Sequence, residues 1–352
     1  MKKAAGLRQR DDALAAGNLF AERKAMKSIV IVNLSILFLI ACSTVSLPEP
    51  IGPSTPVVFA ATSPCDHASR SLLKIPETAD CELIKWRLTL LYGPGNLAPA
   101  TYELNYSYGL PKQGTTEFSH VRTKAERKGR WTTVRGTKTD PDAIVYRLDA
   151  DKPYEALSFL KLDDYLIHFL DRDEGLMLGS AGWSYTLNRV GDVGRQTPQT
   201  RPVSISTVKS SAPTPSAPTV TADAAVAVAF VGRSPCRDAA IQLNKAVEAD
   251  CVKVKWDLTL YRNPRTLTPT TYKLKGTFFR ERIREGKWTI VRGAKVKPDA
   301  IVYQLDPDKP QESLSFLKAG DNILFFLDKE RNLLVGNANF SYTLNKAEVL
   351  ER

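Results

Sequence analysis

Hydrophobic and polar residues alternate over short stretches through most of the chain from residue 63 to residue 347, which is the pattern of half-buried β-strands. Trp86, Leu88 and Leu90 would share one face of such a strand, and Tyr342 and Leu344 alternate in the same way. Turn-forming stretches such as "GPGN", "RNPR" and "DPDKP" interrupt the pattern every 8 to 14 residues. Each half of the chain therefore predicts seven or eight short antiparallel strands, which hide their edges by closing into a barrel or stacking as a sandwich.

The chain contains one module twice. Three stretches of the first half return in the second: "KWRLTL" (85–90) as "KWDLTL" (255–260), "PDAIVY" (141–146) at 298–303, and "SYTLN" (184–188) at 341–345. Corresponding positions lie 170 residues apart up to Tyr102 and Tyr272, and 157 residues apart after Trp131 and Trp288. The first copy therefore carries 13 extra residues between these points, which we interpret as a longer hairpin because loop tips tolerate insertions.

These patterns predict an all-β protein with two tandem small antiparallel β-barrels, each with a short helical insert near its start. We expect the barrels to span residues 63–190 and 234–347. The segment between them, 191–233, is rich in Pro, Ser, Thr and Ala and has almost no aromatic residues. Such a composition cannot bury enough apolar surface to fold, so it predicts an extended linker.

The helical insert is clearest in the second copy. The segment "CRDAAIQLNKAVEADC" (236–251) places five apolar residues near one stripe at helical spacing: Ala240, Ile241, Leu243, Ala246 and Val247. Its counterpart, "CDHASRSLLKIPETADC" (65–81), contains Pro76 and predicts a shorter helix.

The N-terminal segment has the layout of an export signal. Lys27 precedes an apolar run of 13 residues from Ile29 to Ala41, which is too short to span a bilayer. The end of this run, Leu39-Ile40-Ala41-Cys42, resembles the bacterial lipobox, in which the cysteine is acylated and the chain is cleaved just before it. We therefore expect a signal peptide over 1–41, with Met26 as a plausible true start, a lipidated Cys42 and a flexible tether over 42–62; a core helix with a buried free cysteine is the alternative.

The composition is consistent with an exported protein that has a mild excess of positive charge. The whole chain has 49 basic and 38 acidic residues, a net charge of +11, and removing the seven basic and three acidic residues of 1–41 leaves +7. Charges of both signs are scattered through the repeats, without a basic patch interleaved with aromatic residues. The pattern does not favour nucleic-acid binding.

Cysteine usage predicts two disulfides. With Cys42 carrying lipid, four of the five cysteines remain, and the two of each copy enclose 15 residues in the first copy and 14 in the second. In an oxidising compartment the default is a bond between Cys65 and Cys81 and another between Cys236 and Cys251. A metal site is the alternative, but the only nearby histidine is His67, and its counterpart in the second copy is Asp238.

Eight repeated aromatic positions are candidates for a pocket or for the core. At strand spacing, core positions are the more common outcome. They are Trp86, Tyr102, Trp131, Tyr185, Trp256, Tyr272, Trp288 and Tyr342.

Candidate catalytic groups are scarce. The three histidines are His67, His120 and His168; His168 corresponds to Phe325, and His120 falls in the extra hairpin. A general base shared by both copies would have to work without histidine. The turns at Asp149 and Asp306 begin like calcium loops but lack the glycine and distal glutamate of an EF-hand, so hairpin turns are the simpler interpretation. No catalytic residue or metal ligand is assigned.

Each module resembles the N-terminal domain of the copper resistance lipoprotein NlpE. The resemblance rests on a "PC…DC" opening, "LTLY" and "TY.L" strands, a "G.W" strand, "IVY.LD", "LSFL" and a "LDK..NLL" hairpin. It implies a small lipocalin-related barrel, an outer-membrane lipoprotein, a role in envelope stress sensing and a link to copper. In that family the cysteines form a close Cys-x-x-Cys pair, whereas here the helical insert separates them.

The leading hypothesis is a non-enzymatic, membrane-anchored envelope lipoprotein. Its partners would be membrane lipid through Cys42 and an envelope protein. The alternative is a carrier that holds a small hydrophobic ligand inside each barrel. Filled barrels with two disulfides would favour the first function, and a cavity of several hundred Å³ would favour the second.

Overall fold

The computed structural model describes residues 56–191 and 226–347, apart from residues 94, 96–97, 120–121 and 248–249. The predicted signal peptide, the lipidated Cys42, most of the tether, most of the linker and His120 lie outside the described residues. Those expectations stay predictions. Both barrels belong to one compact unit of the chain.

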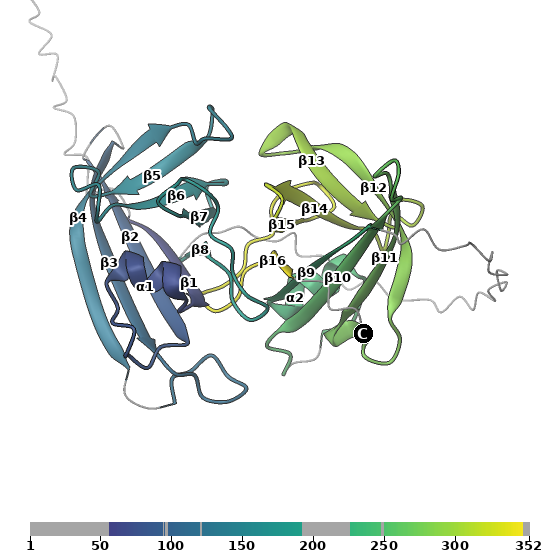
Figure 1. Cartoon of the computed structure of the whole chain (residues 1–352), viewed down its shortest axis with the longest axis horizontal. Helices are drawn as coiled ribbons and strands as arrows, with labels where there is room; N and C mark the ends of the chain where they lie inside the picture. The colour runs from purple at the N-terminus through teal and green to yellow at the C-terminus, as the bar shows by residue number, and fades with distance from the viewer. Residues whose placement is uncertain are drawn as a thin grey trace, which may run out of the picture. The chain divides into compact units, whose positions relative to one another are not determined.

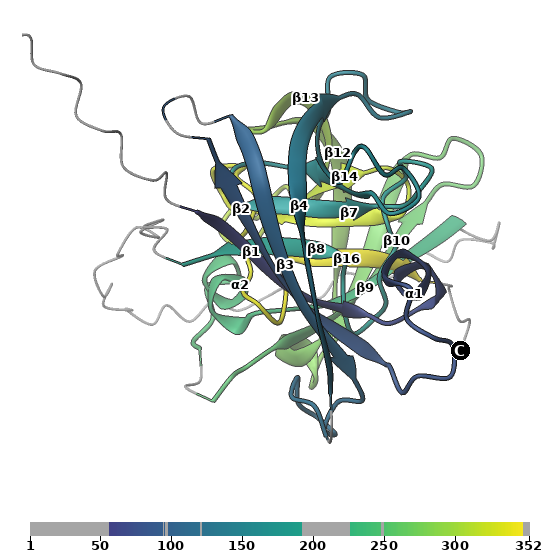
Figure 2. The ribbon, with the colours of Figure 1, turned by 90° about the vertical axis from the view of Figure 1, so that its left-hand side faces the viewer.

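The first barrel closes from eight antiparallel strands in sequence order, with β1 pairing back onto β8 (Figures 1 and 2). Its strands are β1 (Val57–Pro64), β2 (Leu83–Tyr92), β3 (Pro99–Gly109), β4 (Thr123–Arg135), β5 (Ile144–Leu148), β6 (Leu157–Lys161), β7 (Leu166–Leu170) and β8 (Thr186–Val190). The helix α1 (His67–Leu73) lies between β1 and β2. We call this unit barrel 1.

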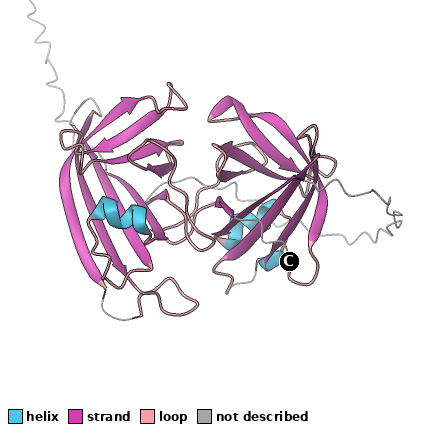
Figure 3. Cartoon of the chain, in the orientation of Figure 1, coloured by secondary structure: helices cyan, strands magenta, loops and turns pink. Residues whose placement is uncertain are grey.

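Barrel 2 repeats this architecture of strands with a short helix (Figure 3), and β9 closes onto β16. Its strands are β9 (Val226–Ser234), β10 (Val254–Arg262), β11 (Pro269–Gly276), β12 (Arg284–Ala294), β13 (Lys297–Leu305), β14 (Leu314–Ala319), β15 (Ile323–Leu327) and β16 (Thr343–Ala347). The helix α2 (Cys236–Gln242) follows β9, and the short 3-10 helix η1 (Thr277–Phe279) follows β11. The prediction of two tandem all-β barrels is confirmed.

Strand alternation sets the direction of the side chains. In β2, Trp86, Leu88 and Leu90 are at most 3% exposed and point into barrel 1, whereas Lys85 and Arg87 lie on its outer face. The same alternation in β10 fills barrel 2. Each interior is a continuous cluster of aliphatic and aromatic residues.

The barrels begin earlier than predicted. β1 and β9 occupy residues assigned to the tether (42–62) and to the linker (191–233), so the boundaries at 63 and 234 were wrong by six to eight residues. Both strands are rich in alanine and border Pro/Ser/Thr-rich sequence, which obscured them. They are indispensable, because each pairs with two neighbours and closes its barrel.

The short helical insert of the second copy is confirmed, but the helix covers only the first part of the apolar stripe. α2 ends at Gln242, the following Leu243 forms its C-cap, and Ile241 and Val247 are exposed. A continuous helix of 16 residues would hold its terminal Cα atoms about 22 Å apart, whereas the disulfide holds those of Cys236 and Cys251 5.9 Å apart. Ring closure therefore keeps both helices short. α1 and α2 each have seven residues, so the expectation of a shorter helix in the first copy, which rested on Pro76, was wrong.

The extra residues of the first copy form the expected hairpin. β3 and β4 are 11 and 13 residues long, against 8 and 11 for β11 and β12. The loop between β3 and β4 is steadied by an isolated bridge between Pro111 and Phe118. Lys253 of barrel 2 donates a hydrogen bond of 2.9 Å to the Gly114 carbonyl near its tip.

The two barrels meet along a seam formed mainly by β7, β8, β15, β16 and the loops that precede β8 and β16. Several side chains contact their own counterpart 157 residues away, so the seam has the reciprocal form of a two-fold interface. Hydroxyl oxygens of Ser184 and Ser341 lie 2.5 Å apart, and those of Thr186 and Thr343 lie 2.9 Å apart. The rings of Trp183 and Phe340 stack with centroids 5.8 Å apart.

Two asparagines lock the seam reciprocally. Asn188 accepts a hydrogen bond from the Gly336 amide at 2.7 Å and donates one to the Asn337 carbonyl at 2.9 Å. Asn345 accepts from the Gly179 amide at 2.9 Å and donates to the Ser180 carbonyl at 3.2 Å. Both asparagines are 1% exposed, so their amides depend on these partners.

An apolar cluster supports the polar part of the seam. All five residues of β7 and all five of β15 are buried, which means that both faces of each strand are covered. Leu166 of barrel 1 joins the outer-face cluster of barrel 2 that includes Val302, Phe325 and Leu333. The seam therefore has an apolar patch beside a hydrogen-bonded row.

We predict that the seam holds without the linker. A recognition site for a sequence-specific protease, introduced between residues 200 and 215, allows the covalent connection to be cut. The two halves should still co-elute in size-exclusion chromatography. In the nicked protein, Asn188→Ala with Asn345→Ala removes four hydrogen bonds across the seam. At about 1 kcal/mol for each bond, the free energy of association of the two halves falls by about 4 kcal/mol. The halves of this variant should separate at micromolar concentration.

Asn263→Ala is the matched control, because this asparagine caps only a local turn of barrel 2. Its nicked form should co-elute like the parent. Separation of the halves already in the parent protein would contradict the prediction.

Candidate functional site

The eight candidate aromatic residues all lie in the barrel cores. None is more than 4% exposed, and all eight belong to the core clusters of the two barrels. The ring of Trp86 lies 4.6 Å from that of Phe169, and Trp256 lies 4.9 Å from Phe326. These side chains occupy the interiors, and the structure does not bring them together around a cavity.

The buried indoles are hydrogen-bonded in the same way in both copies. The Nε1–H of Trp86 donates to Ser63 Oγ at 2.8 Å, and that of Trp256 donates to Ser234 Oγ at 2.8 Å. Trp131 and Trp288 each donate to a backbone carbonyl at 2.9 Å. Because each of these four indole donors has a partner within the fold, none of the four is left to hold a ligand.

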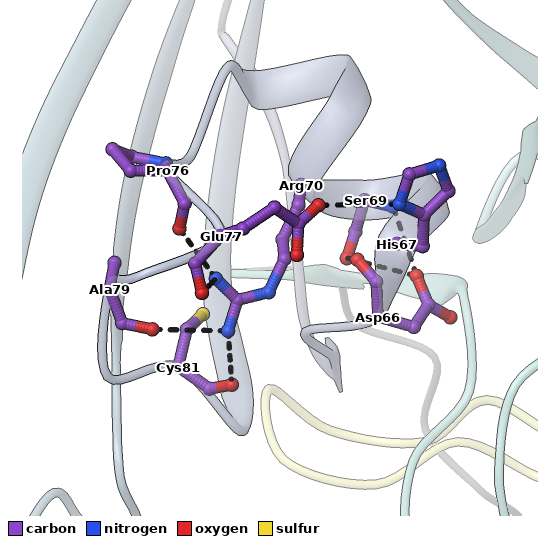
Figure 4. A network of polar contacts seen from close by, with 8 residues as sticks. All are labelled: Asp66, His67, Ser69, Arg70, Pro76, Glu77, Ala79 and Cys81. Atoms are coloured by element: carbon purple, nitrogen blue, oxygen red, sulfur yellow. Dashed lines mark hydrogen bonds and ion pairs between the residues drawn. The ribbon is translucent and has the colours of Figure 1, made fainter.

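Each barrel carries a disulfide-closed loop after its first strand, as the cysteine spacing predicts. Cys65 is bonded to Cys81 and Cys236 to Cys251, with Cα atoms 5.7 and 5.9 Å apart. In barrel 1 the loop is also pinned by Arg70, whose guanidinium donates to the carbonyls of Pro76, Ala79 and Cys81 (Figure 4). The N-terminus of α1 is capped by Asp66, which accepts from the Ser69 amide at 2.9 Å.

A thiolate copper site does not fit these residues. All four barrel cysteines are consumed in disulfides, and a disulfide sulfur is not the soft anionic ligand that Cu(I) requires. Within the described ranges, no group of three or more His, Cys, Asp or Glu side chains is placed to hold a metal ion. His67 only faces Glu77 on the surface, at 3.3 Å.

The acidic turns have a structural role. Asp149 and Asp306 adopt left-handed backbone angles, with φ of 51° and 49°, and turn their carboxylates inward, where they are 5% and 3% exposed. Asp149 accepts hydrogen bonds from the Tyr102 hydroxyl at 2.5 Å and from Arg127 at 3.0 Å. The inward direction of these carboxylates argues against the calcium-loop alternative.

Asp149, Tyr102 and Arg127 form a buried triad, and barrel 2 repeats it. Asp306 accepts from the Tyr272 hydroxyl at 2.5 Å and from Arg284 at 2.6 Å. Glycine is required beside each triad, because a Cβ at Gly129 or Gly286 would overlap the carboxylate oxygen. Burial, reinforced by the hydrogen bond to the aspartate, raises the pKa of each tyrosine well above its usual range, so the hydroxyl stays a donor.

We predict that Tyr102→Phe lowers the free energy of unfolding by about 1–3 kcal/mol, because a buried carboxylate loses a hydrogen bond. Urea unfolding followed by tryptophan fluorescence measures this change. Tyr154→Phe is the control, since Tyr154 is 87% exposed and should tolerate the loss of its hydroxyl. Equal stability of the two variants would show that the triad contributes nothing.

His168 joins the seam to the core of barrel 1. Its Nε2 lies 3.0 Å from the Met177 carbonyl, which can only accept, so Nε2 carries the proton and Nδ1 accepts from Thr186 Oγ1 at 2.9 Å. Each hydroxyl has one proton, so the chain then runs in a single direction: Ser184 donates to Ser341, Ser341 to Thr343, Thr343 to Thr186, and Thr186 to His168.

The seam histidine is built to remain neutral. Burial lowers the pKa of His168 to about 4, and the hydrogen bond to Met177 opposes this shift only in part. The ring of Phe325, its counterpart in barrel 2, lies 5.6 Å away. Between about pH 6.5 and pH 4 the unfolded chain binds a proton at this histidine and the folded chain does not. The free energy of unfolding therefore decreases as the pH is lowered through that window.

We predict that His168 alone makes the protein about 2 kcal/mol less stable at pH 5 than at pH 7.5. His168→Phe introduces the residue that barrel 2 has at this position, Phe325. The substitution should remove this part of the pH dependence, even if it also changes the free energy of unfolding by an amount that is the same at every pH. Urea unfolding at both pH values gives the difference between the parent and the variant. Parallel curves of stability against pH for the parent and His168→Phe would contradict the prediction.

Sequence reasoning missed the seam, although a signal was present. "LIHFL" (166–170) and "ILFFL" (323–327) are nearly continuous apolar runs in a chain that otherwise alternates. Such runs are typical of strands covered on both faces. Here the second face is covered by the other barrel.

Comparison of the chain with protein-family models, with curated proteins and with solved structures finds no match. The resemblance to the NlpE family therefore stays a prediction from short motifs. No helix among the described residues has the length and apolar character needed to cross a bilayer.

Proposed function

We propose that this chain is a lipid-anchored, non-enzymatic protein of the bacterial cell envelope. In this proposal Cys42 supplies the anchor, and the two barrels form one rigid recognition module that binds envelope components through its outer surface. The resemblance to the NlpE family assigns it to the outer membrane and to stress sensing.

The disulfide in each barrel is the observation that carries the proposal. Disulfides persist in oxidising compartments such as the periplasm and are rare in the bacterial cytoplasm. The export signal and the lipobox-like sequence before Cys42 supply an independent reason to expect the same compartment. Two unrelated features of the chain thus support export.

The barrel interiors favour recognition at the surface over transport of a hydrophobic ligand. A carrier needs a ligand-sized interior volume, but here Trp, Tyr and Phe rings occupy the interior and contact one another. The reciprocal seam adds rigidity by joining the barrels through buried hydrogen bonds. A packed double barrel presents a fixed outer surface, which suits binding to a partner.

We predict that the protein extracted from bacterial membranes begins at Cys42 and carries acyl chains there. Intact mass spectrometry should show the loss of residues 1–41, the added mass of a lipid anchor, and four cysteines that resist alkylation until they are reduced. The variant Cys42→Ser should keep its N-terminal segment and lose the membrane fraction. An unprocessed, unacylated parent chain would overturn the proposal.

A further inference from the structure

The outer face of barrel 1 carries a groove across β2, β3 and β4. Its volume is about 230 Å³. The inward-facing residues Trp86, Tyr106 and Ala125 form one row across the three strands, so their backbone makes the floor. Outward-facing side chains of the adjacent rows make its walls.

The walls are strongly basic. One row across the strands is Lys85, Ser107 and Lys124, and the row on the other side includes Arg87 and Asn105. Arg122 stands at the end of the groove, just before β4. The groove is therefore lined by four cations and by two neutral side chains that can form hydrogen bonds.

Ion pairs do not neutralise these four cations. In the described part of the chain, Lys85, Arg87, Arg122 and Lys124 form no ion pair, and the one acid acting on them is Glu117, which interacts with Lys85 at longer range. The nearest acid in the adjacent row, Glu126, is engaged by Lys128 at 2.7 Å, and Lys128 also lies 3.7 Å from Glu103. Burial lowers the pKa of Lys85, with Glu117 opposing the shift and Arg122 adding to it.

Phe118 holds two of the cations at the groove. The hairpin folds back so that this ring lies 5.6 Å from Lys85 Nζ and 5.9 Å from Arg122 Cζ, within the range of cation–π contacts. The ring also packs where Gly109 leaves room for it. The cations are thus positioned by the extra hairpin of the first copy.

The described residues of barrel 2 do not repeat this cluster of cations. Its counterpart of Arg87 is Asp257, and its β11–β12 connection lacks the extra residues that supply Arg122 and Lys124. The difference is local, since the two barrels otherwise share their fold. Excess positive charge in a concave surface favours a multiply charged oxyanion, which lysine and arginine bind through charge-assisted hydrogen bonds.

We propose that the groove formed by Lys85, Arg87, Arg122 and Lys124 binds a phosphate-bearing ligand. Its volume accommodates one or two phosphate groups. Ser107 supplies a neutral hydrogen bond, as does the second amide hydrogen of Asn105, whose first is donated to Glu103 at 3.0 Å. The phosphate belongs either to a free small molecule or to a lipid headgroup. This proposal goes beyond anchoring and stands whether or not Cys42 carries lipid.

Calorimetry of the full-length Cys42→Ser protein with inorganic pyrophosphate at low salt tests the free-ligand source. Flotation with phosphatidylcholine vesicles, with and without phosphatidylglycerol, tests the headgroup source. Arg122→Gln with Lys124→Gln should weaken binding about 100-fold, since each charge-assisted contact contributes about tenfold. The matched control is Lys273→Gln with Lys275→Gln, which removes the same charge from the outer face of β11 in barrel 2.

Saturable binding of either probe that falls in the groove variant and changes less than twofold in the control supports the proposal. An equal loss in both double variants would mean a response to net charge alone and would overturn it. Absence of saturable binding to both probes, up to millimolar pyrophosphate, would also overturn it. Thermal unfolding of each variant checks that the hairpin substitutions leave the barrel folded.

Discussion

Closure of each barrel, by β1 onto β8 and by β9 onto β16, is the constraint on which the remaining structure depends. Closure satisfies every strand edge and encloses a space that large aromatic side chains fill. The interior is used for packing. The outer surface is where the two copies differ, at the groove, and where they meet, at the seam.

The buried titratable side chains form their hydrogen bonds within the fold and do not require a ligand. Asp149 and Asp306 are buried acids, yet tyrosine and arginine from neighbouring strands satisfy them in both copies. His168 is fully buried, yet Met177 and Thr186 use both of its nitrogens. Buried titratable groups often mark active sites, but here their contacts are saturated within the fold, and the triad is repeated.

Much of the fold could be predicted from periodicity and repetition, whereas contacts between distant segments could not. The alternation in "KWRLTL" and "KWDLTL" identified β2 and β10, and the cysteine spacing identified both disulfides. β1 and β9 lack that contrast, and the apolar stripe after Cys236 indicated a helix without showing that it ends at Gln242, where the disulfide requires the chain to turn back. The groove could not be predicted from the sequence, because it depends on strand register. In that register Ser107 pairs with Lys85 on one side and with Lys124 on the other, so the two lysines lie in one row.

The seam explains which positions of the two copies must match and which are free to differ. On a two-fold axis each side chain meets its own counterpart, so Ser184 and Thr186 can stay identical to Ser341 and Thr343, since a hydroxyl both donates and accepts.

A charged residue cannot meet itself without repulsion. At that kind of position the copies differ: Asp140 faces its counterpart Lys297 at 2.8 Å. That ion pair lowers the pKa of Asp140 and raises that of Lys297. Two identical chains would place like charges there, so a tandem chain can hold an ion pair that a symmetric dimer of either barrel cannot.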